Sequence, residues 1–230
     1  MKTLGLVGGT SWVSTAEYYG HLNRLVNKKL GGDEAAKLIL YSLNFGEICR
    51  NNANGDLSVN GKLVVDAAER LAKAGAQGLM LCANTMHMYA DQVEAATGLP
   101  VIHIAHAVAE EIKRRGMSKV LLLGTKYTME MPFYSDILQG YGIEVMIPDD
   151  ADRAMVHARI FEELTKDVFT ESTREDYRAV MRKAMDNGAE CVILGCTEIP
   201  LLFDGHAIPL PGLDTALVHS EAAVKFALDS

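Results

Sequence analysis

Two short stretches of the chain carry residue types that suit proton-transfer chemistry. Cys82 and His87 lie in "LCANTMHM" (81–88), and Cys196 lies in "LGCTE" (194–198). A thiolate is a suitable base where backbone N–H groups or a positive charge lower its pKa. The Asn and Thr side chains of the same stretches, placed where a strand turns into a helix, can hold a carboxylate. These two stretches are therefore the candidate centre of the chemistry.

An internal repeat relates the two stretches. The segment "GAQGLMLCANT" (75–85) aligns without gaps on "GAECVILGCTE" (188–198), and "KTLGLVGGT" (2–10) has a counterpart in "KVLLLGT" (119–125) at a similar separation. A repeat of this length indicates two similar domains rather than a short-period solenoid.

The alignment of the repeats decides which thiol is of interest. Ala83, and not Cys82, stands opposite Cys196. Neighbouring residues of an extended strand point to opposite faces, so Cys82 cannot serve as the group at position 83 by a simple rotation. For Cys82, Cys49 and Cys191 a role as small buried side chains is the simpler interpretation.

Short apolar runs alternate with longer segments of helical periodicity, and this pattern indicates an α/β protein with mainly parallel sheets flanked by helices. The predicted strands are 4–7, 38–43, 78–81, 101–104, 119–123, 144–147, 191–194 and 207–210. The predicted helices are 14–30, 59–74, 86–97, 134–138, 154–164, 174–185 and 214–228. In such folds sites form at the carboxyl ends of strands. We expect two pseudo-symmetric α/β domains, the first of residues 1–100 with 212–230 and the second of residues 101–211.

Composition and charge exclude several classes of partner and cofactor. The 230 residues carry a formal charge of −8, and no run of Lys and Arg is longer than a pair, so we expect no nucleic-acid partner. The four cysteines form no C-x-x-C motif, and no membrane-length apolar run is present, which indicates a cytoplasmic protein with no membrane partner. Gly5, Gly8 and Gly9 do not form G-x-G-x-x-G, and Cys191 and Cys196 are poorly spaced for zinc, so neither a dinucleotide nor a metal is expected.

Four segments of the chain resemble those of the aspartate/glutamate racemase superfamily. They are "GLVGGTSWVSTAEYY" (5–19), "ANTMH" (83–87), "LLGTKYTME" (122–130) and "GAECVILGCTEIPLL" (188–202). The resemblance implies an isomerase that racemises an amino acid without a cofactor, most simply L- or D-aspartate or glutamate. It also implies an active site in the cleft between two pseudo-symmetric domains, and a homodimer, since relatives are commonly dimers.

The resemblance assigns roles residue by residue. Cys196 matches the catalytic Cys of the family's Gly-Cys-Thr-Glu motif, whereas Ala83 stands where the family has a reactive Cys or Thr before Asn-Thr. His87 is expected either to orient a catalytic group or to cap its helix. The residues expected to bind the substrate are polar side chains near the sheet edges: Thr10, Ser11, Asn52, Asn84, Thr85, Thr125, Thr197 and Glu198.

The missing group at position 83 leaves the activity open. Racemisation by proton transfer requires two acid/base groups that flank the α-carbon, and alanine supplies neither an acid nor a base. Ala83 is therefore either an engineered loss of the opposing base or a natural departure for which another group or water compensates. The activity is then impaired or one-sided. Two alternatives remain: a one-base enzyme on the same fold, as in arylmalonate decarboxylase relatives, and an inactive small-carboxylate-binding protein.

Overall fold

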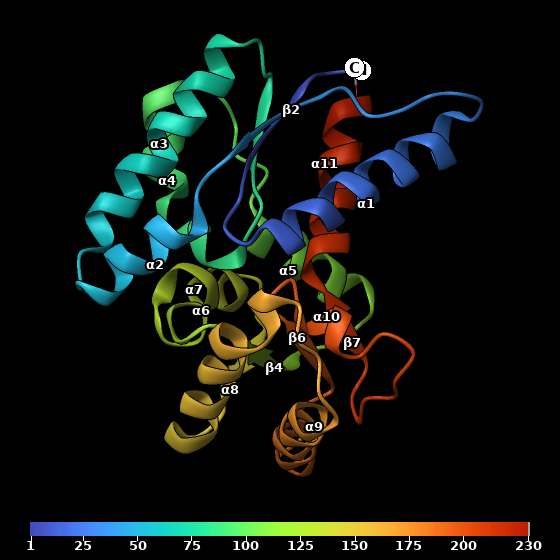
Figure 1. Ribbon diagram of the computed structural model, residues 1–230. Coiled ribbons are helices and arrows are strands. Elements are labelled where there is room, and N and C mark those ends of the chain that lie inside the picture. Colours follow the sequence, from blue (N-terminus) through green and yellow to red (C-terminus); the bar gives the residue numbers. More distant parts are fainter. Residues whose placement is uncertain (230) are drawn as a thin grey trace. The chain divides into compact units, whose positions relative to one another are not determined.

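The computed structural model describes residues 1–229 of the chain, which forms two compact units. Unit 1 comprises Met1–His103 with His219–Ser230, and unit 2 comprises Ile104–Val218. Each unit contains an open parallel sheet with helices around it (Figure 1), so the predicted α/β fold class is confirmed. The predicted domain bounds, 1–100 with 212–230 and 101–211, stay a prediction.

The sheet of unit 1 has three parallel strands in the order β2-β1-β3. The strands are β1 (Leu4–Gly8), β2 (Leu38–Ser42) and β3 (Gly78–Leu81). The helices of this unit are α1 (Trp12–Leu30), α2 (Phe45–Ala53), α3 (Leu57–Lys73), the 3₁₀ helix η1 (Asn84–Tyr89) and α4 (Ala90–Thr97), together with the part of α11 (Thr215–Leu228) that follows Val218. All residues of β1 and β3 are buried, as expected of strands covered on both faces.

The sheet of unit 2 has four parallel strands in the order β5-β4-β6-β7. The strands are β4 (Lys119–Leu123), β5 (Glu144–Met146), β6 (Cys191–Leu194) and β7 (Gly212–Asp214). The helices are α5 (Ile104–Arg114), α6 (Lys126–Glu130), α7 (Pro132–Gly140), α8 (Asp150–Glu162), η2 (Leu164–Lys166), α9 (Glu171–Asp186) and α10 (Ile199–Leu202).

Capping and periodicity explain the helices α3 and α9. Asp56 accepts a hydrogen bond from the Ser58 N–H and caps α3, and Thr170 caps α9 in the same way through the Thr173 N–H. Both helices bury an apolar stripe at helical spacing, which in α9 includes Tyr177, Val180, Met181 and Ala184. In α3 the corresponding residues are Val64, Ala67, Ala68 and Leu71.

Two predicted strands are wrong. In the predicted strand 101–104, Val101 makes an isolated bridge to Leu79, and α5 begins at Ile104 because the apolar residues from there on repeat with helical period. The predicted strand 207–210 is displaced to β7, beyond Pro209 and Pro211. Proline has no N–H to donate to a ladder, so pairing starts after it.

The helical predictions differ from the structure mainly at short elements, but α5, with 11 residues, was also not predicted, because the apolar run at its start was assigned to a strand. The predicted helix 86–97 is divided into η1 and α4, and the short helices α2, α6 and α10 were not predicted. One or two turns contain too few residues to display a period of 3.6. Among residues 1–229, no helix has the length and apolar character that crossing a membrane requires.

Candidate active site

Cys196 follows the end of β6 and lies at the edge of the sheet of unit 2. The Gly195 N–H donates to the carbonyl oxygen of Leu123, at the end of the neighbouring strand β4, at 2.7 Å. A Cβ atom at position 195 would lie 2.5 Å from that same oxygen, so a glycine is required there. Thr125, which follows β4, caps α6 by accepting a hydrogen bond from the Thr128 N–H. Because β4 and β6 are neighbours, Thr125 and Cys196 lie at the same edge.

Cys196 and Glu198 form a hydrogen-bonded pair. The Cys196 thiol donates to Oε2 of Glu198 at 3.0 Å, and the hydroxyl of Thr197 donates to the same oxygen at 3.1 Å. Glu198 is 2% exposed, and its Oε1 has no hydrogen-bond partner within the described residues. A buried carboxylate oxygen without a partner is costly, so this atom is suited to accept a hydrogen bond from a bound ligand.

The surroundings of Cys196 favour its protonated form. Burial, the negative charge of Glu198 and the hydrogen bond to that carboxylate all raise the pKa of the Cys196 thiol well above its usual value. The backbone N–H groups of Glu198 and Thr197 lower this pKa, but by less. The resting group is therefore a thiol that can donate a proton.

The end of β1 presents two hydroxyls in unit 1. Gly9 adopts φ 78°, and a Cβ atom there would lie 2.1 Å from the Leu43 carbonyl oxygen, so the turn requires glycine. The next two residues, Thr10 and Ser11, are buried, and their hydroxyl oxygens have no hydrogen-bond partner in the part of the chain that the structure describes. These hydroxyls are suited to donate to a carboxylate.

The end of β3 carries the Ala83 motif. Ala83 is in extended conformation, with φ −157° and ψ 141°, and immediately precedes η1. Asn84 is buried and Thr85 half-buried in the first turn of this helix. β1 and β3 are neighbours, so this motif lies at the same sheet edge as Thr10. Cys82 is fully buried, and burial raises the pKa of its thiol, which supports its interpretation as a core residue.

His87 belongs to a cluster of three imidazoles in unit 1. Its Nδ1–H donates to the carbonyl oxygen of Ala83 at 3.0 Å, because a carbonyl can only accept, and Nε2 therefore carries the lone pair. This Nε2 is buried without a hydrogen-bond partner among residues 1–229. The ring centroids of His103 and His219 lie 4.7 Å and 5.2 Å from that of His87. Burial and these two rings lower the pKa of His87 well below its usual value, so the ring is neutral.

Two hydrogen bonds fix the orientation of the His219 ring in the same cluster. Its Nε2–H donates to the carbonyl oxygen of Ile102 at 2.6 Å, and its Nδ1 accepts from the Tyr18 hydroxyl at 2.9 Å. The hydrogen bond joins α1 and α11, which lie against one another in Figure 1. Burial lowers the pKa of His219 to about 3. Sequence reasoning missed His219 and Tyr18, because no local pattern connects residues so far apart in the chain.

Asn52 is held in a separate network of amides. Asn60 on α3 donates to Oδ1 of Asn52 at 2.8 Å and accepts from Asn51 at 2.8 Å. Asn60 is buried and was not predicted as a site residue. Its hydrogen bonds orient the side chains on α2 rather than joining Asn52 to the residues at the end of β3. Within the described residues, no group of three or more His, Cys, Asp and Glu side chains is arranged to hold a metal ion.

Comparison with known proteins identifies the class to which this fold and these motifs belong. The sequence profile of the Asp/Glu/Hydantoin racemase family matches residues 7–223, and the chain belongs to this family. The predicted relationship to the aspartate/glutamate racemase superfamily is thereby confirmed.

Particular relatives agree with this assignment. A candidate Asp/Glu racemase from Yersinia pestis, known from its crystal structure, shares 46% sequence identity with this chain. The two structures superpose with a TM-score of 0.90, and 100% of both chains is covered. An aspartate racemase homologue from Pyrococcus horikoshii OT3, also known from its crystal structure, shares 35% sequence identity, with a TM-score of 0.82 and 100% of both chains covered. The broad specificity amino-acid racemase RacX of Bacillus subtilis is 24% identical over 164 residues, which cover 71% of this chain and 70% of RacX.

Proposed function

We propose that the chain is a cofactor-independent amino-acid isomerase that acts on aspartate or glutamate, with Cys196 as one of its acid/base groups. The observation that carries the proposal is the buried Cys196–Glu198 hydrogen bond at 3.0 Å, which places a polarised thiol at the end of a central strand. Membership of the racemase family and the names of the relatives support the reaction class and the substrate.

The proposed chemistry is proton transfer at the α-carbon. In one direction the thiolate of Cys196 takes the α-proton, the C–H bond breaks, and its electron pair moves into the substrate carboxylate as an enolate-like intermediate. In the other direction the thiol returns a proton to that carbon, and the thiolate is formed again. No oxidant or reductant is consumed, since one proton and one electron pair move in each step.

Glu198 determines which of these directions is favoured at the start of the cycle. Its carboxylate holds the proton on Cys196, so the resting enzyme is prepared to donate a proton to an enolate. Abstraction requires the thiolate, which becomes more abundant as the pH rises or when a bound substrate ammonium offsets the charge of Glu198.

Substrate binding is assigned to hydroxyls and amides at the two sheet edges. The buried Thr10 and Ser11 hydroxyls, with Asn84 and Thr85, are proposed as donors to the substrate in unit 1. Thr125, Thr197 and the Oε1 atom of Glu198 are proposed for unit 2. The role of Asn52, the homodimer and the cytoplasmic location stay predictions.

Ala83 makes the proposed reaction one-sided. A methyl group neither accepts nor donates a proton, so the face of the α-carbon opposite Cys196 lacks a side-chain base from this position. We therefore propose that the chain exchanges the α-proton of one enantiomer faster than it inverts the configuration.

The test is incubation of the protein with L- and D-aspartate and L- and D-glutamate in deuterated water. Proton NMR measures loss of the α-proton, and chiral chromatography measures inversion. We expect exchange on one enantiomer in excess of inversion, and loss of that exchange in Cys196→Ser. Exchange that survives in Cys196→Ser contradicts the role of the thiol. Carboxylate binding with no exchange in the unsubstituted protein favours an inactive binding protein, and loss of carbon dioxide from an aryl malonate favours the one-base decarboxylase.

A further inference from the structure

The single turn of α10 fixes the backbone of the Cys196 motif. α10 begins directly after Glu198, and the Leu202 N–H donates to the Glu198 carbonyl oxygen at 3.1 Å. The Ile199 N–H donates to the Cys196 carbonyl oxygen at 3.0 Å. A helix of one turn has little stability of its own, so its ends must be held by other groups.

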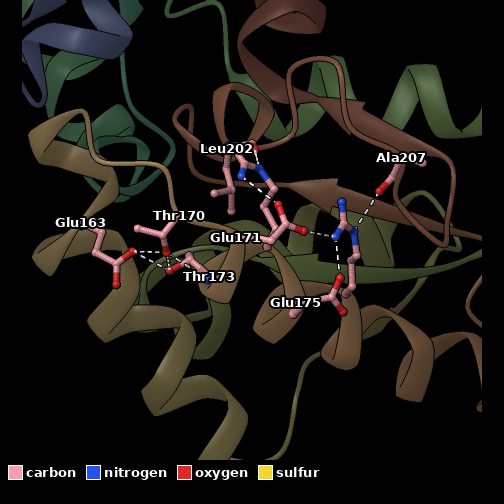
Figure 2. Close-up of polar contacts among 9 residues, drawn as sticks. Glu163, Thr170, Glu171, Thr173, Glu175, Leu202 and Ala207 are labelled. Atoms are coloured by element: carbon pink, nitrogen blue, oxygen red, sulfur yellow. Dashed lines mark hydrogen bonds and ion pairs between the residues drawn. The ribbon is translucent and has the colours of Figure 1, made fainter.

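Arg174 on α9 holds the far end of α10. Its Nε–H donates to the carbonyl oxygen of Leu202 at 2.7 Å, and its terminal nitrogen donates to Glu171 at 3.0 Å. Figure 2 shows Leu202 and Glu171 in this arrangement. The last carbonyls of a helix have no partner within the helix, and a cation at this end is also favourable. The Arg174 side chain is 15% exposed, so it is substantially shielded from water.

Arg178, one turn further along α9, makes a similar contact with a different part of the loop. Its Nε–H donates to the carbonyl oxygen of Ala207 at 3.1 Å, and it pairs with Glu171 and Glu175 (Figure 2). Its side chain is 16% exposed. Arg178 therefore matches Arg174 in charge, exposure and helix, but it binds the chain beyond α10.

The start of α9 is itself anchored. Thr170 and Thr173 both donate their hydroxyls to Glu163, as Figure 2 shows, and Glu163 also pairs with Arg159. Tyr177 is buried in the core beneath this turn. Arg174 thus extends from an anchored helix to the last carbonyl of α10, a helix of one turn.

We propose that Arg174 is a positioning residue, which holds α10 and thereby keeps the Glu198 carboxylate against the Cys196 thiol. The importance of this contact for catalysis rests on the function proposed above, but the geometric effect does not. Removal of the guanidinium leaves the Leu202 carbonyl without its donor, and the turn that begins at Glu198 keeps only the apolar contacts of Ile199 and Leu202 with the core. The carboxylate is then free to leave the sulfur.

The sign of the effect on the thiol separates positioning from simple charge loss. Deletion of a nearby cation disfavours a thiolate and raises a thiol pKa. Departure of the Glu198 carboxylate removes a negative charge from the sulfur and lowers the pKa of Cys196. Arg174→Met is therefore expected to lower this pKa although it removes a positive charge.

The experiment measures the alkylation rate of Cys196 by iodoacetamide against pH, with mass spectrometry of the peptide that contains Cys196. A Cys49→Ser background removes the half-buried competing thiol. In Arg174→Met we expect the midpoint to fall by at least about half a pH unit, a threefold change in the thiolate-to-thiol ratio. Arg178→Met is the matched control and should leave the midpoint unchanged. Arg174→Lys, which keeps a donor, should lower the midpoint less than Arg174→Met does.

A double-mutant cycle shows whether the effect passes through Glu198. In a Glu198→Gln background, Arg174→Met should not lower the midpoint further. An unchanged or higher midpoint in a folded Arg174→Met variant overturns the proposal, as does an equal shift in Arg178→Met. If Arg174→Met does not fold, Arg174→Gln is measured against the same criteria. Alkylation needs no substrate, so a shift in a protein without exchange activity refutes the proposed function and leaves the positioning role intact.

Discussion

The Nδ1–H of His87 donates to the carbonyl oxygen of Ala83 at 3.0 Å. The imidazole is therefore held by the backbone of Ala83, the position proposed to lack the second base. Because the contact involves the Ala83 carbonyl, a different side chain at position 83 leaves it in place.

Ala83→Cys and Ala83→Thr should raise the rate of inversion relative to exchange. Each supplies a group that accepts or donates a proton on the second face, and a positioned acid/base group contributes about 10²–10⁴-fold. Chiral chromatography of aspartate and glutamate checks this, with Ala83→Val as a control of similar bulk to threonine. If the Cys and Thr variants bind substrate and fold normally yet invert no faster than Ala83→Val, position 83 is not the missing base.

Glu198→Gln should displace the pH profile of α-proton exchange to lower pH. In the unsubstituted protein burial and Glu198 raise the pKa of Cys196, so the thiolate fraction and the exchange rate increase from neutral toward alkaline pH. Removal of the negative charge lowers this pKa and brings the rise to a lower pH. NMR exchange rates measured across the pH range provide the test. Glu190→Gln, at the opposite end of β6, should keep the original profile, and identical profiles for all three proteins would disprove the coupling.

His219 should make the stability of the protein depend on pH in the acidic range. Its folded-state pKa of about 3 lies below the ordinary value of 6.5, so between these values the unfolded chain binds the extra proton. The contribution of the neutral His219 ring to the free energy of unfolding is fully present above pH 6.5. It is lost as the pH falls toward 3, with a slope of up to about 1.4 kcal/mol per pH unit.

Urea unfolding at pH 7 and pH 5.5 measures this dependence. His219→Gln keeps a donor for Ile102 but does not titrate, so its free energy of unfolding should fall less between the two pH values. His106→Gln, at an exposed histidine, should behave as the unsubstituted protein. An undiminished slope in His219→Gln would show that other groups account for the acid sensitivity.

Gly195→Ala should destabilise unit 2 and displace Cys196. The added Cβ would lie 2.5 Å from the Leu123 carbonyl oxygen, a backbone atom that cannot rotate away, and we expect a loss of about 1–3 kcal/mol. Gly140→Ala is the control: nothing lies within 4 Å of a Cβ there, and it should stabilise α7 by about 0.5–1 kcal/mol. Thermal unfolding and the exchange assay check both. A Gly195→Ala variant with unchanged stability and exchange rate would mean that β4 and β6 can separate without cost.

The sequence alone determined the fold class, most of the long elements and the contrast between Cys196 and Ala83. These features depend on apolar periodicity, on turn residues and on a repeat, all of which are local in the chain. The same reasoning failed at 101–104 and 207–210, where the apolar runs resemble strands but a helix start and two prolines decide the pairing.

Tertiary structure decided the chemical state of the candidate groups. The direction of the Cys196 pKa shift depends on where the Glu198 side chain points and on how deeply both are buried. The imidazole cluster requires η1, the segment before α5 and α11 to meet. The support of α10 by Arg174 joins residues far apart in the chain. A pKa follows from the distance to other charges and from access to water, and these are properties of the folded chain.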